Sequence, residues 1–312
     1  MPAVIAGRGS AGKAARHIIA DKCEPQMNNL TFVRARPPDK YILDVSKVVH
    51  ILPRIKAGTP SAVVDVGGGM AVSVQLTLPP GVECVTIYDM AVYAAVQSLY
   101  AEENEMITIP MVCRAMCGNL NATNLSDKIK QEVTLSISRL MATHITIDAA
   151  SQKEKYRLDK VVYADRLLNL QMVTARNDCG QECLHYRFVT TPALYAYSMA
   201  VKHIYAFENE TVRAPTISNT RAAIVMRYCL LRRVAIINRN GGNGKIAYDT
   251  LLEEAGCADS CKGSKTTKSR CRMRIKRILE HLVAQGEIGS YQEYKLHHKF
   301  AGVRVFATKR CT

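Results

Sequence analysis

Residues 262–277 hold eight Lys and Arg side chains in sixteen positions, and no acidic residue. Guanidinium and ammonium groups bind phosphate oxygens, and an arginine can also donate two hydrogen bonds to one guanine edge. Like charges this close repel one another, so a helix of this composition would be weak by itself. The repulsion is tolerable where phosphates lie against the helix. The segment therefore predicts contact with a polyanion, against the ordinary alternative of a solvated basic face.

A helical spacing of 100° per residue divides this segment into two faces. Cys271, Ile275, Ile278 and Leu282 share the face that we expect in the core. Arginines on the opposite strip suit guanine edges, and the cations that flank it suit phosphates. The strip comprises Thr266, Ser269, Arg270, Met273 and Arg277, and its flanks are Lys265, Lys268, Arg272 and Arg274.

A hairpin is expected directly after this helix, and its tip carries four more candidate side chains. Cationic hairpin tips commonly contact the DNA backbone or the minor groove. The two adjacent histidines at the tip do not suit a metal, because neighbouring side chains in a strand point to opposite faces. Solvent exposure is the alternative for this pair. The four tip residues are Lys295, His297, His298 and Lys299.

A second, milder candidate surface lies on a helix predicted for residues 127–142, which Ser126 caps. Its core stripe consists of Ile129, Val133, Ile137 and Leu140. The outward face can contact DNA, but an exposed Leu135 also suits a dimer or interdomain surface, so both interpretations stay open. The candidate DNA-binding residues here are Lys128, Gln131, Thr134, Ser138 and Arg139.

Two glycine-rich motifs resemble cofactor loops but lack essential parts. Residues 7–13 nearly spell a P-loop, yet Ala14 stands where a hydroxyl would hold Mg²⁺. Residues 63–69 resemble the first loop of a methyltransferase, yet a β-branched, alternating run follows the glycines where that fold requires a helix. Residues 61–78 instead predict a hairpin around Gly67, Gly68 and Gly69. We therefore expect no cofactor.

The cysteines and histidines do not predict a metal or nucleophile site either. Three pairs have the spacing C-x3-C, whereas zinc sites more often use C-x2-C with a matching second pair. A nicking enzyme would need two histidines separated by one apolar residue, together with a nucleophilic tyrosine. In this chain, His297 and His298 are adjacent, and no such set of residues appears. We expect reduced, mostly core cysteines and no enzyme activity. The pairs are Cys113/Cys117, Cys179/Cys183 (near His185) and Cys257/Cys261.

The composition fits a soluble DNA-binding protein of about two domains. The 312 residues carry a net charge of +15 and are 48% apolar, without any tryptophan. No apolar run reaches the roughly 18 residues of a membrane span, and the N-terminus lacks the layout of a secretory signal. We therefore expect a cytoplasmic, nucleoid-associated location. Residues 216–312 hold 19 Lys and Arg against 7 Asp and Glu, a net +12 of the total.

The order of predicted elements is the same in two stretches of the chain. Residues 89–190 predict helix, strand, helix, helix and a hairpin, with Asp89 as the first N-cap, and residues 216–312 repeat this order. This is the order of a winged helix, so we expect an α+β chain with two winged-helix domains in tandem. An unrelated pair of mixed domains is the alternative. The predicted segments are a basic arm (1–40), a lead-in and hairpin (41–88), the first winged helix (89–190), a connecting helix (191–215) and the second winged helix (216–312).

Several moderate motifs over residues 85–310 resemble replication initiators of plasmids and mobile elements from Gram-positive bacteria. AVYAAVQSLYAEENEMITIPMVCRAMCG and VTLSISRLMATHITIDA resemble their first winged helix, and PALYAYSMAVKHI resembles their interdomain segment. RAAIVMRYCLLRRVAII, RIKRILEHLVAQGEIGSYQEYK and GVRVF resemble their second winged helix. The arm before Lys40 has no counterpart in that family, and the cysteine content is unusual.

The resemblance implies a protein that binds repeated sites in double-stranded DNA at its own origin and helps to melt the duplex. It also implies recruitment of a host helicase or helicase loader, and repression of its own promoter as a homodimer. A transcriptional repressor is the first alternative function, and a nucleic-acid methyltransferase is a more distant one. A structural nucleoid-type binder is a third class.

Overall fold

The computed structural model describes residues 36–56, 61–176, 182–213, 220–258 and 265–308. Residues 1–35, which include the glycine-rich motif at residues 7–13 and most of the predicted arm, lie outside these ranges. In the described part, no helix is both long and apolar enough to cross a bilayer. Helices and antiparallel sheets alternate along the chain, which confirms the predicted α+β class.

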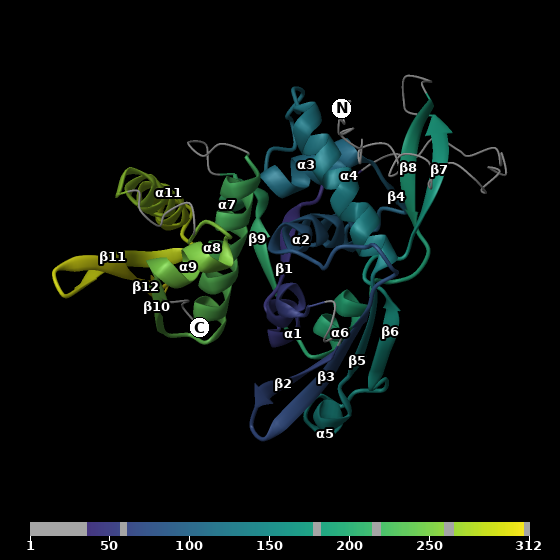
Figure 1. The fold of residues 1–312 in the computed structure, drawn as a ribbon, viewed down its shortest axis with the longest axis horizontal. Helices are drawn as coiled ribbons and strands as arrows, with labels where there is room; N and C mark the ends of the chain where they lie inside the picture. Colours follow the sequence, from purple (N-terminus) through teal and green to yellow (C-terminus); the bar gives the residue numbers. More distant parts are fainter. Residues whose placement is uncertain (1–35, 57–60, 177–181, 214–219, 259–264, 309–312) are drawn as a thin grey trace, which may run out of the picture.

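The second unit has the winged-helix order in full. Within the described ranges, this unit consists of three helices, a short strand between the first two of them, and a C-terminal hairpin. The short strand completes a sheet of order β10-β12-β11. The hairpin projects from the left end of the molecule in Figure 1. The elements are α8 (Arg221–Arg239), β10 (Asn243–Ala247), α9 (Tyr248–Glu254), α11 (Lys265–Ala284), β11 (Ile288–Leu296) and β12 (Lys299–Ala307).

The first unit repeats this topology. Its sheet has the order β4-β8-β7, which is again the short strand, then the last strand, then the middle one. Its hairpin lies at the opposite end of the molecule from β11 and β12 (Figure 1). The elements are α2 (Ile87–Ala101), β4 (Met106–Ile107), α3 (Ile109–Cys117), α4 (Asp127–Ala142), β7 (Leu170–Arg176) and β8 (Glu182–Phe188).

A second sheet interrupts the first unit between α4 and β7, and its pairing was not predicted. The strand at 144–148 pairs with the glycine hairpin on one side and with the strand at 162–166 on the other. The resulting sheet has the order β2-β3-β5-β6 and lies at the bottom of Figure 1. Its elements are β2 (Ser61–Gly67), β3 (Met70–Thr77), β5 (His144–Asp148), η3 (Ala150–Gln152), α5 (Lys153–Tyr156) and β6 (Val162–Arg166).

The hairpin predicted around the three glycines is confirmed. β2 and β3 pair antiparallel, and Gly67, Gly68 and Gly69 all have a positive φ. The carboxylate of Asp65 accepts a hydrogen bond from the Gly67 amide at 2.7 Å and supports the turn. Residues without a side chain adopt this backbone region at little cost, which explains the run of glycines.

The connecting segment is shorter as a helix than predicted. Its first helix, α6 (Ala193–Ala200), ends early, because Lys202 adopts a left-handed conformation and the His203 amide donates to the Ser198 carbonyl. The chain then forms β9 (Ile204–Glu208), which pairs antiparallel with β1 (Lys40–Asp44), and ends in α7 (Asn209–Val212). The lead-in thus joins the connecting segment in a two-stranded sheet. After β1, the lead-in continues with α1 (Lys47–Ile51) and η2 (Leu52–Arg54).

The central helix α2 is buried on nearly every side, from Tyr88 to Leu99. It begins earlier than predicted, because Thr86 and not Asp89 is the N-cap. The Thr86 hydroxyl accepts from the Asp89 amide, and the Asp89 carboxylate accepts from the Thr86 amide at 2.7 Å, which makes a capping box. Helices α3, α4 and α8 and strand β1 all pack against α2, so one helix joins the cores of both units.

A buried arginine also links the two units. Arg227 of α8 donates to the carbonyl of Met116 at 2.9 Å, at the C-terminal end of α3, and is only 3% exposed. Free carbonyls at a helix end carry partial negative charge, so they are suitable partners for a buried cation. This contact fixes α8 on the first unit without a carboxylate partner among the described residues.

Gly118, which ends α3, provides a test of this packing. Its φ is +63°, and an added Cβ would lie 2.5 Å from the backbone nitrogen of Arg213. We expect Gly118→Ala to destabilise the protein by about 2–5 kcal/mol, from left-handed strain plus steric overlap. Urea unfolding followed by circular dichroism measures the change.

Gly286 is the matched control, since its φ is +72° and an added Cβ meets nothing within 4 Å. Gly286→Ala should cost only the conformational part, about 1–2 kcal/mol. Equal losses of stability in the two variants would show that the close approach of α7 to Gly118 adds nothing to the cost of Gly118→Ala.

Candidate nucleic-acid interface

Helix α11 presents an apolar face inward and a cationic face outward. Cys271, Ile275, Ile278 and Leu282 are buried, as the helical spacing predicted. The predicted outward strip is exposed along its whole length, and Met273 retains 47% of its surface. Arg272 and Arg274 are half-buried, and the other candidate residues of α11 are exposed: Lys265, Thr266, Lys268, Ser269, Arg270, Met273 and Arg277.

The cations of α11 fall into two groups. Lys268 forms an ion pair with Asp249 at 2.7 Å, and Arg272 and Lys276 both contact Glu293. Within the described ranges, the other four have no carboxylate within ion-pair distance, so their charge is available to an external anion. These four are Lys265, Arg270, Arg274 and Arg277.

Arg272 does not extend toward a phosphate as predicted but ties α11 to the hairpin. Its guanidinium donates two hydrogen bonds to Glu293 of β11, at 2.5 and 2.7 Å, and lies over the Phe300 ring of β12 at 3.4 Å. The Tyr248 hydroxyl donates to the same carboxylate at 2.6 Å. These bonds hold the pKa of Glu293 down at about 2, with Arg272 as the largest cause. The network sets the angle between helix and hairpin, and its long-range pairing left no local signal in the sequence.

A small hollow of about 220 Å³ lies where α9, α11 and β12 meet. Lys265, Lys268 and Arg272 line it together with the Ser269 hydroxyl, and Phe300 closes one side. Lys268 and Arg272 already pair with Asp249 and Glu293, so Lys265 is the lining cation whose charge remains available to a phosphate oxygen.

The hairpin tip is a two-residue turn made by the histidine pair. Leu296 pairs with Lys299, and both His297 (φ 48°) and His298 (φ 63°) are left-handed, as in a type I′ turn. Asparagine and glycine are the usual residues here, so two histidines carry backbone strain of about 1–2 kcal/mol each. The four predicted tip residues Lys295, His297, His298 and Lys299 are all exposed.

The candidate face of α4 in the first unit is less basic. Lys128, Gln131 and Ser138 are exposed, whereas the half-buried Thr134 donates its hydroxyl proton to the Lys130 carbonyl. Leu135 is 64% exposed in the middle of this face. Helix α4 carries three cations and two carboxylates, whereas α11 carries seven cations and one carboxylate. The electrostatic attraction for a polyanion is therefore concentrated on α11.

Arg139 has a structural partner that the sequence did not reveal. Its guanidinium donates to the buried carboxylate of Asp89 at 2.7 Å and to Glu83 at 2.7 Å, and its side chain is only 15% exposed. Ser136 also donates to Asp89, at 2.6 Å. Arg139 therefore anchors α4 to the start of α2, and we leave it out of the proposed interface.

Of the three C-x3-C pairs, only Cys113/Cys117 lies wholly within the described residues. Cys113 and Cys117 are buried in α3, and burial raises the pKa of the Cys113 thiol to about 12. Cys179 and Cys261 lie outside the described residues. Elsewhere in the described ranges, no group of three or more metal-ligating side chains comes together.

Comparisons with known proteins give a distant structural likeness only. No family model matches the chain, and no curated protein matches it. Two crystal structures of domains 2 and 3 of RctB are similar in outline, each with 12% sequence identity and a TM-score of 0.46. The first match covers 89% of this chain and 100% of the RctB chain, and the second covers 80% and 90%. The winged-helix assignment rests on the element order and sheet topology of this chain.

Replacement of Arg139 tests whether this side chain stabilises the fold. We expect Arg139→Ala to lower the free energy of unfolding by about 1–3 kcal/mol, because the buried Asp89 carboxylate loses a charged donor. Chemical unfolding measures the loss. Lys128→Ala, on the exposed face of the same helix, should change stability by less than about 0.5 kcal/mol. A fully stable Arg139→Ala protein would contradict the anchoring role.

The Glu293 network predicts a pH-dependent contribution to stability. The folded-state pKa of about 2 lies below the ordinary value of 4.5, so the ionised carboxylate stabilises the fold above pH 4.5. This contribution is lost as the pH falls from about 4.5 toward 2. The wild-type protein should be more stable than Glu293→Gln at pH 7, and the difference should narrow between pH 5 and pH 3. Unfolding of both proteins at three pH values tests this, and a constant difference argues against the ion pair.

Proposed function

We propose that this chain is a double-stranded DNA-binding replication initiator, which recognises repeats at the origin of a plasmid or mobile element. The observation that carries this proposal is the exposed cationic strip of α11. It lies on the third helix of a winged-helix unit, the helix that enters the major groove in such folds. Arg270 and Arg277 can read guanine edges, and the flanking lysines can contact phosphates.

The hairpin of β11 and β12 supplies a second contact. Its tip carries four exposed basic or imidazole side chains, and the Glu293 network fixes it relative to α11. A helix in the major groove and a tip on the adjacent backbone or minor groove together define one half-site. In this proposal, Arg272 positions the hairpin and does not contact DNA.

Two units in one chain favour a site longer than a single half-site. The hairpins of the two units lie at opposite ends of the molecule (Figure 1). The first unit would add sequence contacts through Lys128, Gln131, Thr134 and Ser138, at a high effective concentration once the second unit is bound. We further propose that the protein acts by binding without catalysis. Its partners would be a second copy of the chain and a host helicase or helicase loader.

DNA binding should depend on the strip of α11. We expect Arg270→Ala to reduce discrimination at one base pair by about 1–3 kcal/mol, and affinity to fall steeply as salt rises. The measurement is fluorescence anisotropy with duplexes selected from the DNA upstream of the gene. Arg166→Ala, which removes an exposed charge from β6, is the matched control and should bind normally.

The replication role has its own readout. A circle that carries the gene and its upstream DNA should replicate in a permissive host, and Arg270→Ala should abolish replication while Arg166→Ala retains it. Repression of a reporter without replication would instead indicate a transcriptional repressor. A flat salt titration would argue against any polyanion role.

A further inference from the structure

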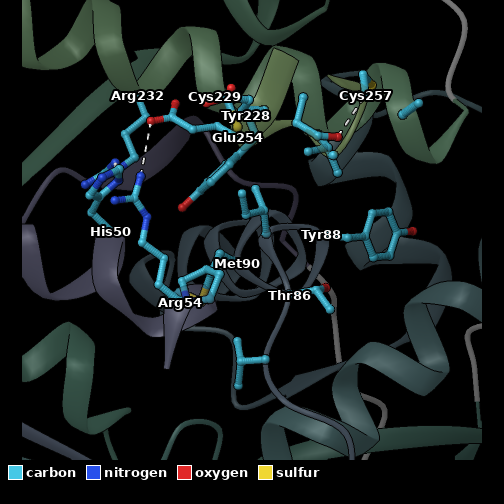
Figure 2. A pocket seen from close by; sticks show the side chains of 18 of the residues that line it. His50, Arg54, Thr86, Tyr88, Met90, Tyr228, Cys229, Arg232, Glu254 and Cys257 are labelled. Carbon is cyan, nitrogen blue, oxygen red and sulfur yellow. Dashed lines mark hydrogen bonds and ion pairs between the residues drawn. The ribbon is translucent and has the colours of Figure 1, made fainter. Parts of the chain in front are cut away.

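A cavity of about 880 Å³ lies between the two units, away from the face of α11. One wall comes from α1, η2 and the start of α2, and the other comes from α8 and the end of α9 (Figure 2). Pockets that bind small molecules have volumes of roughly 300–1,000 Å³. The DNA-binding proposal makes no use of this space.

The middle of the cavity is apolar. Val49, Pro53, Val85, Ile87, Met90 and Val225 line it, and the Tyr88 ring forms part of one end. The apolar surface of these walls is unfavourably exposed to water. An apolar ligand that displaces this water removes the surface from solvent, which favours binding. The cavity therefore suits an organic molecule better than a bare inorganic ion.

Positive charge exceeds negative charge around this apolar middle. Glu254 is the inner carboxylate, and it is already shared by Arg233, at 2.5 and 3.0 Å, and by Arg54 at 3.7 Å. Arg54 is half-exposed and retains free donors. Figure 2 shows His50, Arg54, Arg232 and Glu254 gathered at one end of the cavity.

Arg232 strengthens the positive field at this end. It is 91% buried and donates to the neutral acceptors His50 Nδ1, at 2.8 Å, and Ser46 O, at 2.9 Å. Burial, Arg232 and Arg54 lower the pKa of His50 to about 4, which keeps its imidazole neutral. Asp44 is close enough to interact with Arg232, but its carboxylate is held by Ser198 and by the Ser46 amide.

Arg221 provides a cation beside Tyr88 in the lining of the cavity. Its guanidinium lies over the Tyr88 ring at 4.6 Å, and Ala222 beside it is exposed at the edge of the cavity. The nearby Glu253 is exposed, so its charge is screened by solvent. The cavity thus has apolar walls in its middle and cationic groups from η2 and α8 around them.

We propose that this cavity is a binding site for an amphipathic organic anion, with an apolar body in the middle and a carboxylate, sulfonate or phosphate group at Arg54 or Arg221. A ligand in this position contacts α1 and α2 on one side and α8 and α9 on the other. It would stabilise one arrangement of the two units, as any ligand does that binds one conformation more tightly. The site itself does not depend on the DNA-binding proposal.

The test uses the dye 8-anilinonaphthalene-1-sulfonate and its uncharged analogue N-phenyl-1-naphthylamine, which share an apolar body. Fluorescence titration of the folded full-length chain should give saturable, one-to-one binding of the sulfonate and weaker binding of the neutral dye. Arg54→Met and Arg221→Met each remove one cation at a surface position. At least one of them should weaken sulfonate binding roughly tenfold and leave the neutral dye unaffected.

Two further variants localise the binding. Ala222→Trp adds bulk at the exposed edge of the cavity and should abolish binding of both dyes. Arg239→Met, an exposed arginine of the same helix that does not line the cavity, should bind like the wild type. Circular dichroism and thermal melting of each variant establish that it is folded.

Three outcomes would overturn the proposal. They are the absence of saturable binding to the folded protein, sulfonate binding that persists in Ala222→Trp, and sulfonate binding that neither Met variant weakens. Equal affinity for the two dyes would overturn the preference for an anion. None of these measurements contains DNA, so a failure here leaves the DNA-binding proposal intact, and the reverse also holds.

Discussion

The apolar stripe on α11 determines the direction of every cation on that helix. Burial of Ile275, Ile278 and Leu282 fixes the rotation of the helix about its axis, so the strip through Arg270 and Arg277 faces solvent. A helix with seven cations and one carboxylate gains nothing from its own electrostatics. Packing against α8 and the hairpin must therefore supply its stability, and in the proposed function an external polyanion would relieve the remaining repulsion.

Three carboxylates keep the helices and hairpins in place. Glu293 joins α11 to the hairpin, Asp89 joins α4 to the start of α2, and Glu254 joins the end of α9 to α8 and to η2. Each carboxylate accepts hydrogen bonds or ion pairs from more than one donor, and each neutralises part of the positive charge of the arginines beside it. The cations that remain unpaired on α11 are then concentrated on one outward surface. The same division of charge explains why Arg272 and Arg139 serve the fold.

The two units form one continuous core through α2 and α8. The Arg227 contact with the end of α3 and the pairing of β1 with β9 hold segments that are far apart in the sequence. The cavity between the units interrupts this packing at one place, where arginines and apolar side chains meet. An occupant of that space would contact both units at once, which makes it a natural point at which a ligand could bias their arrangement.

The sequence by itself determined the local features. Glycine and β-branched residues predicted the β2–β3 hairpin, helical periodicity predicted the buried faces of α4 and α11, and the repeated element order predicted two winged helices. The tertiary structure alone decided the long-range pairings, such as β1 with β9 and the insertion of β5 and β6 into a separate sheet. It also decided which cations have internal partners. Periodicity is a property of neighbouring residues, whereas the partner of Arg139 or Arg272 depends on which segments the folded chain brings together in space.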